Sequence, residues 1–176
     1  MEQKVDKTKL IQDFKEILGE KYVLTSESSK YSHRKGFRFG SGEAFAVVKP
    51  GNLLEAWKIL KACVEADFIV IMQAANTGLT GGSTPFGSDY DRSIIIINTM
   101  RVSDIHILNK GKQIVGFSGS TLFGLENKLA PFGREPHSVI GSSCIGASIV
   151  GGVCNNSGGA LVKRGPAYTE LALYAK

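Results

Sequence analysis

A stretch rich in glycine and hydroxyl side chains separates two apolar runs of this chain. It reads QAANTGLTGGSTPFGSDYDRS and spans residues 73–93, between "FIVIM" and "IIII". Several hydrogen-bond donors with little side-chain bulk suit the oxygens of a diphosphate, because glycine lets backbone N–H groups converge on an anion. The alternative is a mobile loop of turn residues, and the sequence of this stretch alone does not decide between a diphosphate site and such a loop. The candidate donors are the backbone at Gly78, Gly81 and Gly82, the Asn76 amide, and the hydroxyls of Thr77, Thr80, Ser83 and Thr84.

A second segment of small residues, GSSCIGASIVGGVCNNSGG, spans residues 141–159. Such residues allow a turn and a short helix to lie against a flat ligand or against another backbone. Asn155 and Asn156 either bond the edges of a ring or cap the helix before Gly158 and Gly159. Tight packing between two subdomains is the alternative. Two such segments favour a large ligand of dinucleotide size between subdomains, where clefts commonly bind ligands.

The familiar signatures of other sites are absent from the sequence. No GxGxxG or GxxxxGK[ST] occurs, and neither does HExxH or GxSxG. The three histidines His33, His106 and His137 are scattered, and His106 falls inside a strand pattern, which favours a structural role. The three cysteines form no CxxC pair, which argues against a disulfide framework or a cysteine zinc site and favours a reducing cytoplasmic compartment.

Hydrophobic periodicity predicts the elements that hold the first segment. A helix over residues 10–18 ends at Gly19, and an irregular stretch follows through about Gly42. A strand over 44–50, a helix from Asn52 and a strand over 68–73 then form a βαβ unit with parallel strands. "SIIIIN" at 93–98 predicts a third strand that is apolar on both faces and therefore central. The 73–93 stretch thus leaves the C-terminal end of a buried strand, where open α/β sheets bind ligands.

Within the helix from Asn52, Glu55 lies three residues after the cap, as in a capping box. Four large apolar residues share one face of this helix. They are Leu53, Trp57, Leu60 and Val64.

The pattern changes after Met100. Residues 104–119 predict two short strands around the turn NKGK, and residues 121–131 predict a helix that Pro131 ends. The predicted division is a lead-in over 1–42, a first subdomain over 43–102 and the start of a second over 103–176. The last residues, AYTELALYAK, read as an unfinished strand, so we expect a piece of a longer protein.

Composition excludes several classes of function. The net charge of +5 comes from dispersed basic residues, with one local group in SHRKGFRFG, and no aromatic stacking set accompanies them. A basic nucleic-acid-binding domain therefore ranks last among the alternatives, and no nucleic-acid partner is expected. Ser138 to Val162 carries no charge, but about half of it is Gly, Ser or Asn, too polar for a membrane span. The charged N-terminus lacks a secretory apolar stretch.

Several motifs resemble those of one flavoprotein family. QAANTGLTGGSTP, followed by REPHSVIGSSCIGASIVGGVCNNSGGALVKRGPAYTE, is similar to the FAD-binding domain of bacterial quinone-dependent D-lactate dehydrogenases. RKGFR and LKACVEAD match as well, so the resemblance covers nearly the whole chain. These enzymes belong to the superfamily typified by vanillyl-alcohol oxidase. The resemblance implies an α+β fold of two subdomains, the first with a parallel βαβ unit and the second truncated here, with FAD extended between them.

The resemblance also implies which residues contact the cofactor. The diphosphate would lie on the first segment, and the second segment would line the flavin and the rest of FAD. No histidine lies between Gln73 and Asp91, so the family's covalent attachment through this loop is excluded and FAD should dissociate. The implied contacts are Ala74, Ala75, Asn76, Thr77, Gly78, Gly82 and Ser83 from the first segment, and Gly141, Ser148 and Gly158 from the second.

The resemblance implies a respiratory enzyme that oxidises D-lactate to pyruvate and passes electrons to quinone. Its partners would be D-lactate and quinone, with peripheral contact on the cytoplasmic side of the inner membrane through parts beyond this chain. As a soluble fragment, the chain is expected to be inactive alone. No catalytic residue is assigned and no metal is expected; Arg34, Arg38 and His137 are the basic residues to watch near the cleft. The alternative is a stand-alone nucleotide-binding module without chemistry.

Overall fold

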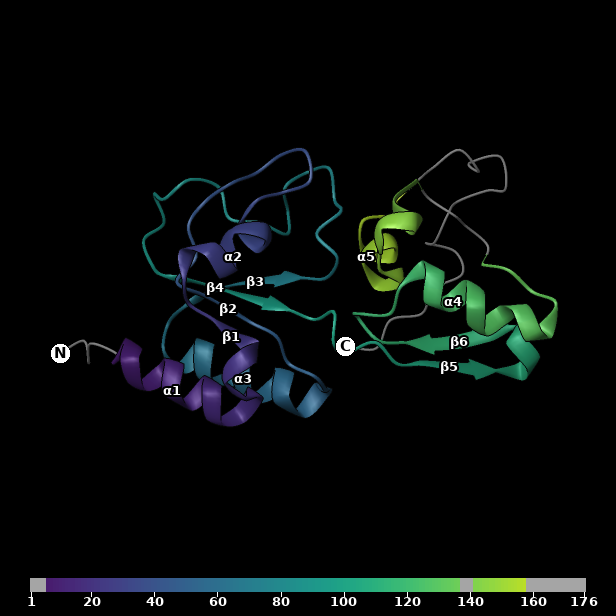
Figure 1. The fold of residues 1–176 in the computed structure, drawn as a ribbon, viewed down its shortest axis with the longest axis horizontal. Coiled ribbons are helices and arrows are strands. Elements are labelled where there is room, and N and C mark those ends of the chain that lie inside the picture. The colour runs from purple at the N-terminus through teal and green to yellow at the C-terminus, as the bar shows by residue number, and fades with distance from the viewer. Residues whose placement is uncertain (1–5, 137–140, 158–176) are drawn as a thin grey trace. The chain divides into compact units, whose positions relative to one another are not determined.

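The computed structural model describes residues 6–136 and 141–157, and the chain divides into two compact units, Met1–Arg101 and Val102–Lys176. Figure 1 shows the helices and strands of each unit. Each unit combines a small sheet with helices, and the predicted α+β class is confirmed.

Unit 1 is built on a mixed four-stranded sheet of order β1-β2-β4-β3. β4 (Ile94–Asn98) lies between β2 (Ala46–Val48) and β3 (Ile69–Gln73) and runs parallel to both. The short β1 (Val23–Leu24) pairs antiparallel with β2. Every residue of β4 is buried, which confirms the prediction of a central strand that is apolar on both faces.

Two helices cover one face of this sheet, α1 (Lys7–Leu18) and α3 (Leu53–Glu65). α1 ends at Gly19, whose positive φ of 86° suits glycine at a helix C-terminus. At the start of α3 the Asn52 side chain accepts from the Glu55 N–H, and the Glu55 carboxylate accepts from the Gly51 N–H. The predicted helix and its cap are therefore present. The core beneath these helices consists of Leu10, Phe14, Leu18, Val23, Ala46, Val48, Ile59, Cys63, Phe68, Ile95 and Ile97.

The apolar face named in the α3 sequence is not the face that packs on the sheet. Trp57 is 57% exposed and Val64 is 66% exposed, and Leu53 and Leu60 are exposed as well. Ile59 and Cys63 are fully buried instead. The space between α3 and the sheet is filled by these two side chains together with small residues such as Ala62, so the largest apolar residues lie on the outside.

The irregular lead-in predicted through Gly42 contains a helix, α2 (Glu27–Arg34), so this part of the prediction is wrong. Ser26 caps it by accepting from the Ser29 N–H, and Glu27 lies in its first turn. The sequence of this helix shows no apolar periodicity, and the one side chain that the helix buries is that of Lys30. Its capping residues were the available signal. A 3₁₀ turn at Glu20–Tyr22 precedes β1.

Unit 2 begins with the predicted hairpin. β5 (Ile105–Leu108) pairs antiparallel with β6 (Gln113–Gly116), and the turn between them includes a 3₁₀ turn at Asn109–Gly111. α4 (Leu122–Leu129) starts at the Thr121 cap, as the sequence predicted. A 3₁₀ turn at Ala130–Phe132, another at Gly141–Ile145 and the short α5 (Ile149–Cys154) follow. The core of this unit is Ile105, Leu122, Leu125, Leu129, Ala147 and Ile149.

Candidate functional site

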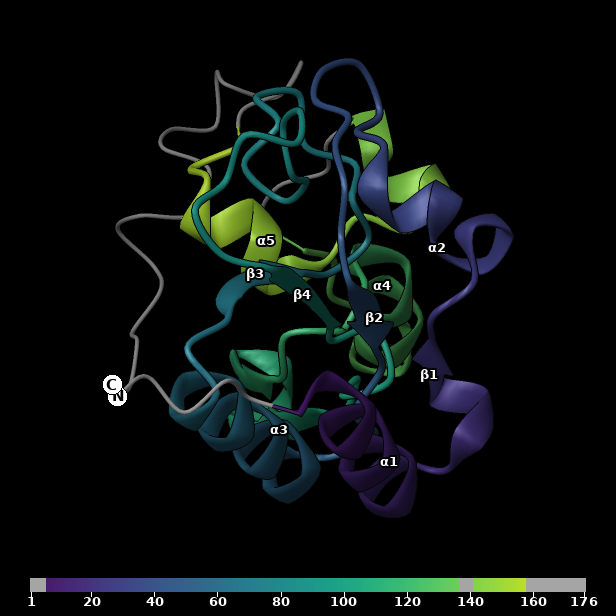
Figure 2. The ribbon, with the colours of Figure 1, turned by 90° about the vertical axis from the view of Figure 1, so that its left-hand side faces the viewer.

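The candidate site of unit 1 is the 74–93 loop, which leaves the end of β3 and returns at the start of β4. Figure 2 shows this loop in teal at the same end of unit 1 as α2 and the loop after it. Backbone contacts join the two loops: the Gly87 N–H donates to the Ser41 carbonyl, and the Glu43 N–H donates to the Gly87 carbonyl. The position beyond the carboxyl ends of β3 and β4 is where parallel sheets place ligands.

The first half of the loop exposes a run of backbone donors. None of the N–H groups of residues 75–83 donates a hydrogen bond to any residue in the described part of the chain. Asn76 has a φ of +55° and Gly81 a φ of +77°, and such left-handed residues turn successive N–H groups toward one side. No charged residue occurs from Ala74 to Ser88. These properties fit an anion such as a diphosphate, which accepts hydrogen bonds and repels carboxylates.

The glycines of the loop fall into two kinds. A Cβ at Gly78 would meet nothing within 4 Å, and one at Gly82 would meet only the Thr80 hydroxyl at 3.9 Å. A Cβ at Gly81 would lie 2.9 Å from the Phe39 ring, and one at Gly40 would lie 2.5 Å from the Thr84 hydroxyl. Gly81 and Gly40 are therefore needed where two loops approach closely, whereas no atom of residues 6–136 or 141–157 explains the missing side chain at Gly78 or Gly82.

The polar side chains of the loop are not all available to a ligand. Ser83 donates its hydroxyl to the Asn76 side chain at 2.9 Å, and buried Thr84 donates to the Gly81 carbonyl at 3.2 Å. Among the described residues, the hydroxyls of Thr77 and Thr80 have no hydrogen-bond partner. The backbone and these two threonines thus form the open donor set, while Asn76 and Ser83 bond within the protein.

The basic residues near this end of unit 1 differ in how they are held. Arg34 pairs with Glu27 at 2.9 Å, and its Nε is buried without a partner among the described residues. Arg38 lies on the surface, in the loop after α2. Burial, reinforced by the charge of Lys49, holds the pKa of His33 below its usual value. His137 lies outside the described residues.

Unit 2 carries the second candidate segment. Gly141 begins the 3₁₀ turn, and Ser148 caps α5 by accepting from the Gly151 N–H at 3.0 Å. Ser148 is buried, so the structure gives its side chain a role in helix capping. Asn155 donates to the Gly151 carbonyl at 2.8 Å, which supports the capping alternative for this residue. Gly158, predicted as a cofactor contact, lies outside the described residues.

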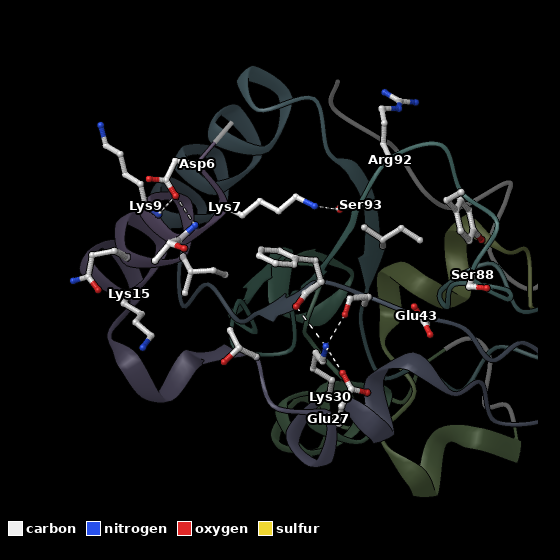
Figure 3. Close-up of a pocket in the computed structure, with 18 of the residues that line it drawn as sticks. Asp6, Lys7, Lys9, Lys15, Glu27, Lys30, Glu43, Ser88, Arg92 and Ser93 are labelled. Carbon is white, nitrogen blue, oxygen red and sulfur yellow. Dashed lines mark hydrogen bonds and ion pairs between the residues drawn. The ribbon is translucent and has the colours of Figure 1, made fainter. Parts of the chain in front are cut away.

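A groove of about 1340 Å³ lies elsewhere on unit 1, between α1, α2 and residues 88–93. Figure 3 shows two of its lysines, Lys7 and Lys30, bonded to other protein groups. Lys30 donates to the Ala44 carbonyl at 2.7 Å and pairs with Glu27 at 2.8 Å, and Lys7 donates to Ser93 at 2.7 Å. The groove contains none of the predicted cofactor contacts, and its basic groups are largely engaged.

Two negative findings concern the described residues alone. None of the helices found there is long and apolar enough to cross a membrane. No group of three or more His, Cys, Asp or Glu side chains within residues 6–136 and 141–157 could hold a metal ion.

Comparisons with known proteins point to one family. A family model described as an FAD binding domain matches residues 44–171. The chain is 63% identical over 167 residues to a quinone-dependent D-lactate dehydrogenase of Haemophilus influenzae, covering 95% of this chain and 30% of that protein. It is 57% identical over 171 residues to the enzyme of the same name from Escherichia coli, covering 97% of this chain and 30% of that protein. The chain therefore spans about 30% of the length of these relatives.

Two solved structures of other enzymes share the fold. An alkyldihydroxyacetonephosphate synthase aligns with a TM-score of 0.79 at 13% identity, over 97% of this chain and 33% of that one. A p-cresol methylhydroxylase aligns with a TM-score of 0.68 at 17% identity, over 85% of this chain and 29% of that one. These two alignments show that the chain shares its fold with both proteins.

Proposed function

The chain belongs to the FAD-binding domain family, and on that premise we propose that it is the FAD-binding portion of a quinone-dependent D-lactate dehydrogenase. Identity of 63% and 57% to two enzymes of that name supports this assignment. The whole enzyme would oxidise D-lactate to pyruvate and pass the electrons to quinone. Contact with the cytoplasmic side of the inner membrane would come through parts of the enzyme outside these 176 residues.

The observation that carries the cofactor assignment is the run of N–H groups at 75–83, which lack partners in the described chain. We assign the diphosphate of FAD to this run, and the open space beside Gly78 and Gly82 to its oxygens. The first-segment contacts proposed are Ala74, Ala75, Asn76, Thr77, Gly78, Gly82 and Ser83, those of Asn76 and Ser83 through the backbone. In unit 2 we assign Gly141 and Ser148 to the rest of the cofactor, together with Gly158.

FAD, when bound, supplies the redox chemistry by accepting a hydride equivalent from the substrate carbon. The residues of this chain bind and orient it. Backbone N–H groups carry partial positive charge without a mobile side chain, so they neutralise the diphosphate at fixed positions. We assign no catalytic base to this chain.

The first test is the absorption spectrum of the purified chain after incubation with excess FAD and desalting. A flavin band that remains with the protein would support the proposal. A folded, colourless protein would contradict FAD binding by these residues.

Glycine variants then locate the diphosphate. We expect Gly78→Val and Gly82→Val to weaken FAD binding by at least roughly tenfold, because a branched side chain would fill the space assigned to phosphate oxygens. Their melting temperatures should change little, since a Cβ at either site meets no close protein atom. Gly81→Val is the contrast: it should lower the melting temperature, because φ is +77° and the Phe39 ring is close. Unchanged FAD affinity in both of the first two variants would refute this placement.

A further inference from the structure

Three side-chain amides form one hydrogen-bonded network at the base of the 74–93 loop, which the sequence did not predict. Gln73 ends β3 and Asn98 ends β4, and both residues are at least 96% buried. Asn98 donates to the Gln73 side-chain oxygen at 3.1 Å and to the Ala74 carbonyl at 2.9 Å. A polar residue at the last position of each of these two apolar strands was the available signal. The sequence predicted both strands to be buried, which holds for β4, whereas β3 lies at the edge of the sheet and only Gln73 in it is buried.

Gln73 uses its amide to close the loop. Its Nε2 donates to the Ser83 carbonyl at 2.8 Å and to the His33 carbonyl at 2.7 Å. The first bond joins the two ends of residues 73–83, and the second fixes them to the end of α2. Both donors are satisfied, as a buried amide requires.

The Asn76 side chain links the same loop to Ser83 and to the segment around the end of α2. Its Nδ2 donates to the Lys35 carbonyl at 2.9 Å and the Ser32 carbonyl at 3.4 Å, and its Oδ1 accepts from the Ser83 hydroxyl at 2.9 Å. Each donor and the acceptor of this amide therefore bonds within the protein, and none is directed to a ligand. Its φ of +55° is a conformation that asparagine accepts more readily than most residues.

Resting on the proposed function, we propose that Asn76 is a positioning residue for FAD, acting through the shape of residues 74–83, and that Ser83 acts through Asn76. The side chains of both serve to hold the backbone donors in place before the cofactor arrives. Such preorganisation raises affinity because less ordering remains to be done on binding. Ser83 and Asn76 were predicted as direct contacts; this inference gives their side chains an indirect role.

The test is a double-mutant cycle on FAD affinity. Asn76→Gly keeps the left-handed backbone accessible but removes three hydrogen bonds, so we expect about a tenfold loss. Ser83→Ala should lose less, since it removes one bond. The double variant should bind no more weakly than Asn76→Gly, because the Ser83 hydroxyl acts through the amide that is already gone.

Asn109→Gly is the matched control. Asn109 is also left-handed, with a φ of 48°, and its side chain bonds Gln113 in the β5–β6 turn. Its variant should bind FAD like the original chain. Additive losses in the cycle would mean that Ser83 contacts FAD directly, and unchanged affinity in Asn76→Gly would overturn the inference for Asn76.

A readout without FAD separates this inference from the proposed function. Thermolysin cleaves before leucine, and Leu79 in this loop is 56% exposed. We expect Asn76→Gly to be cut between Gly78 and Leu79 faster than the original chain and Asn109→Gly. Equal rates would overturn the positioning role of Asn76. If the original chain bound no FAD but this difference in cleavage rate appeared, the proposed function would fail, while the inference that Asn76 holds the loop in place would stand.

Discussion

At the scale of single residues, the environment decides which polar groups of a glycine-rich loop bond to the protein and which stay open. In the sequence, Asn76, Ser83 and Thr84 offer side-chain donors just as Thr77 and Thr80 do. In the structure the first three bond to protein atoms, which leaves two threonines and the backbone as open donors. Composition therefore identified the loop but not the role of each side chain in it.

The three cysteines also differ by environment. Cys63 is fully buried in α3, and desolvation raises the pKa of its thiol to about 12, whereas Cys144 and Cys154 are exposed. Because the thiolate is the reactive form, a buried thiol of high pKa should be inert at neutral pH.

We predict that a thiol reagent such as DTNB titrates two cysteines in the native chain and three after denaturation. The Cys63→Ser variant should titrate two in both states. Three fast-reacting thiols in the native chain would show that Cys63 is not protected.

At the scale of secondary structure, the sequence predicted a helix correctly wherever apolar periodicity and capping residues indicated the same segment. α1, α3 and α4 were predicted on that basis. α2 was missed because its sequence, ESSKYSHR, has no apolar stripe, and its buried side chain is a lysine that bonds backbone carbonyls and Glu27. A helix held by a buried cation gives no hydrophobic period to read.

The orientation of α3 leads to a prediction on two neighbouring residues. Ile59 is fully buried and Leu60 is 41% exposed. We expect Ile59→Ala to lower the free energy of unfolding by about 2–5 kcal/mol, because it leaves a cavity in the core. Leu60→Ala should cost less than about 1 kcal/mol, since an exposed side chain buries little area.

Each variant serves as a control for the other, because both introduce alanine at adjacent positions inside the same helix and differ mainly in the burial of the side chain that is removed. Urea unfolding followed by circular dichroism measures both. A larger loss for Leu60→Ala would mean that the outer face of α3 is the packed one.

At the scale of the whole molecule, the chain is an FAD-binding domain that covers about 30% of the length of its relatives. Its sequence carries no histidine between Gln73 and Asp91, within the loop assigned to the diphosphate. Covalent attachment through a histidine of this loop is therefore impossible.

We predict that FAD bound to the chain is released completely by acid denaturation. After precipitation with trichloroacetic acid, all flavin absorbance should appear in the supernatant and none in the protein pellet. Free FAD mixed with a denatured sample gives the recovery control. Flavin that stays on a peptide after proteolysis would contradict dissociable binding.

The sequence by itself determined the class of the fold, the central strand, the hairpin and the loop that carries the donors. These features follow from local patterns: apolar runs, caps, and glycine where backbone must approach a partner. Only the tertiary structure decided the rest. It assigned Gly81 and Gly40 to loop packing and left Gly78 and Gly82 open. It also joined Gln73, Asn76 and Asn98 to carbonyls up to 44 residues away. Such long-range bonds depend on how segments distant in sequence meet, which no local pattern records.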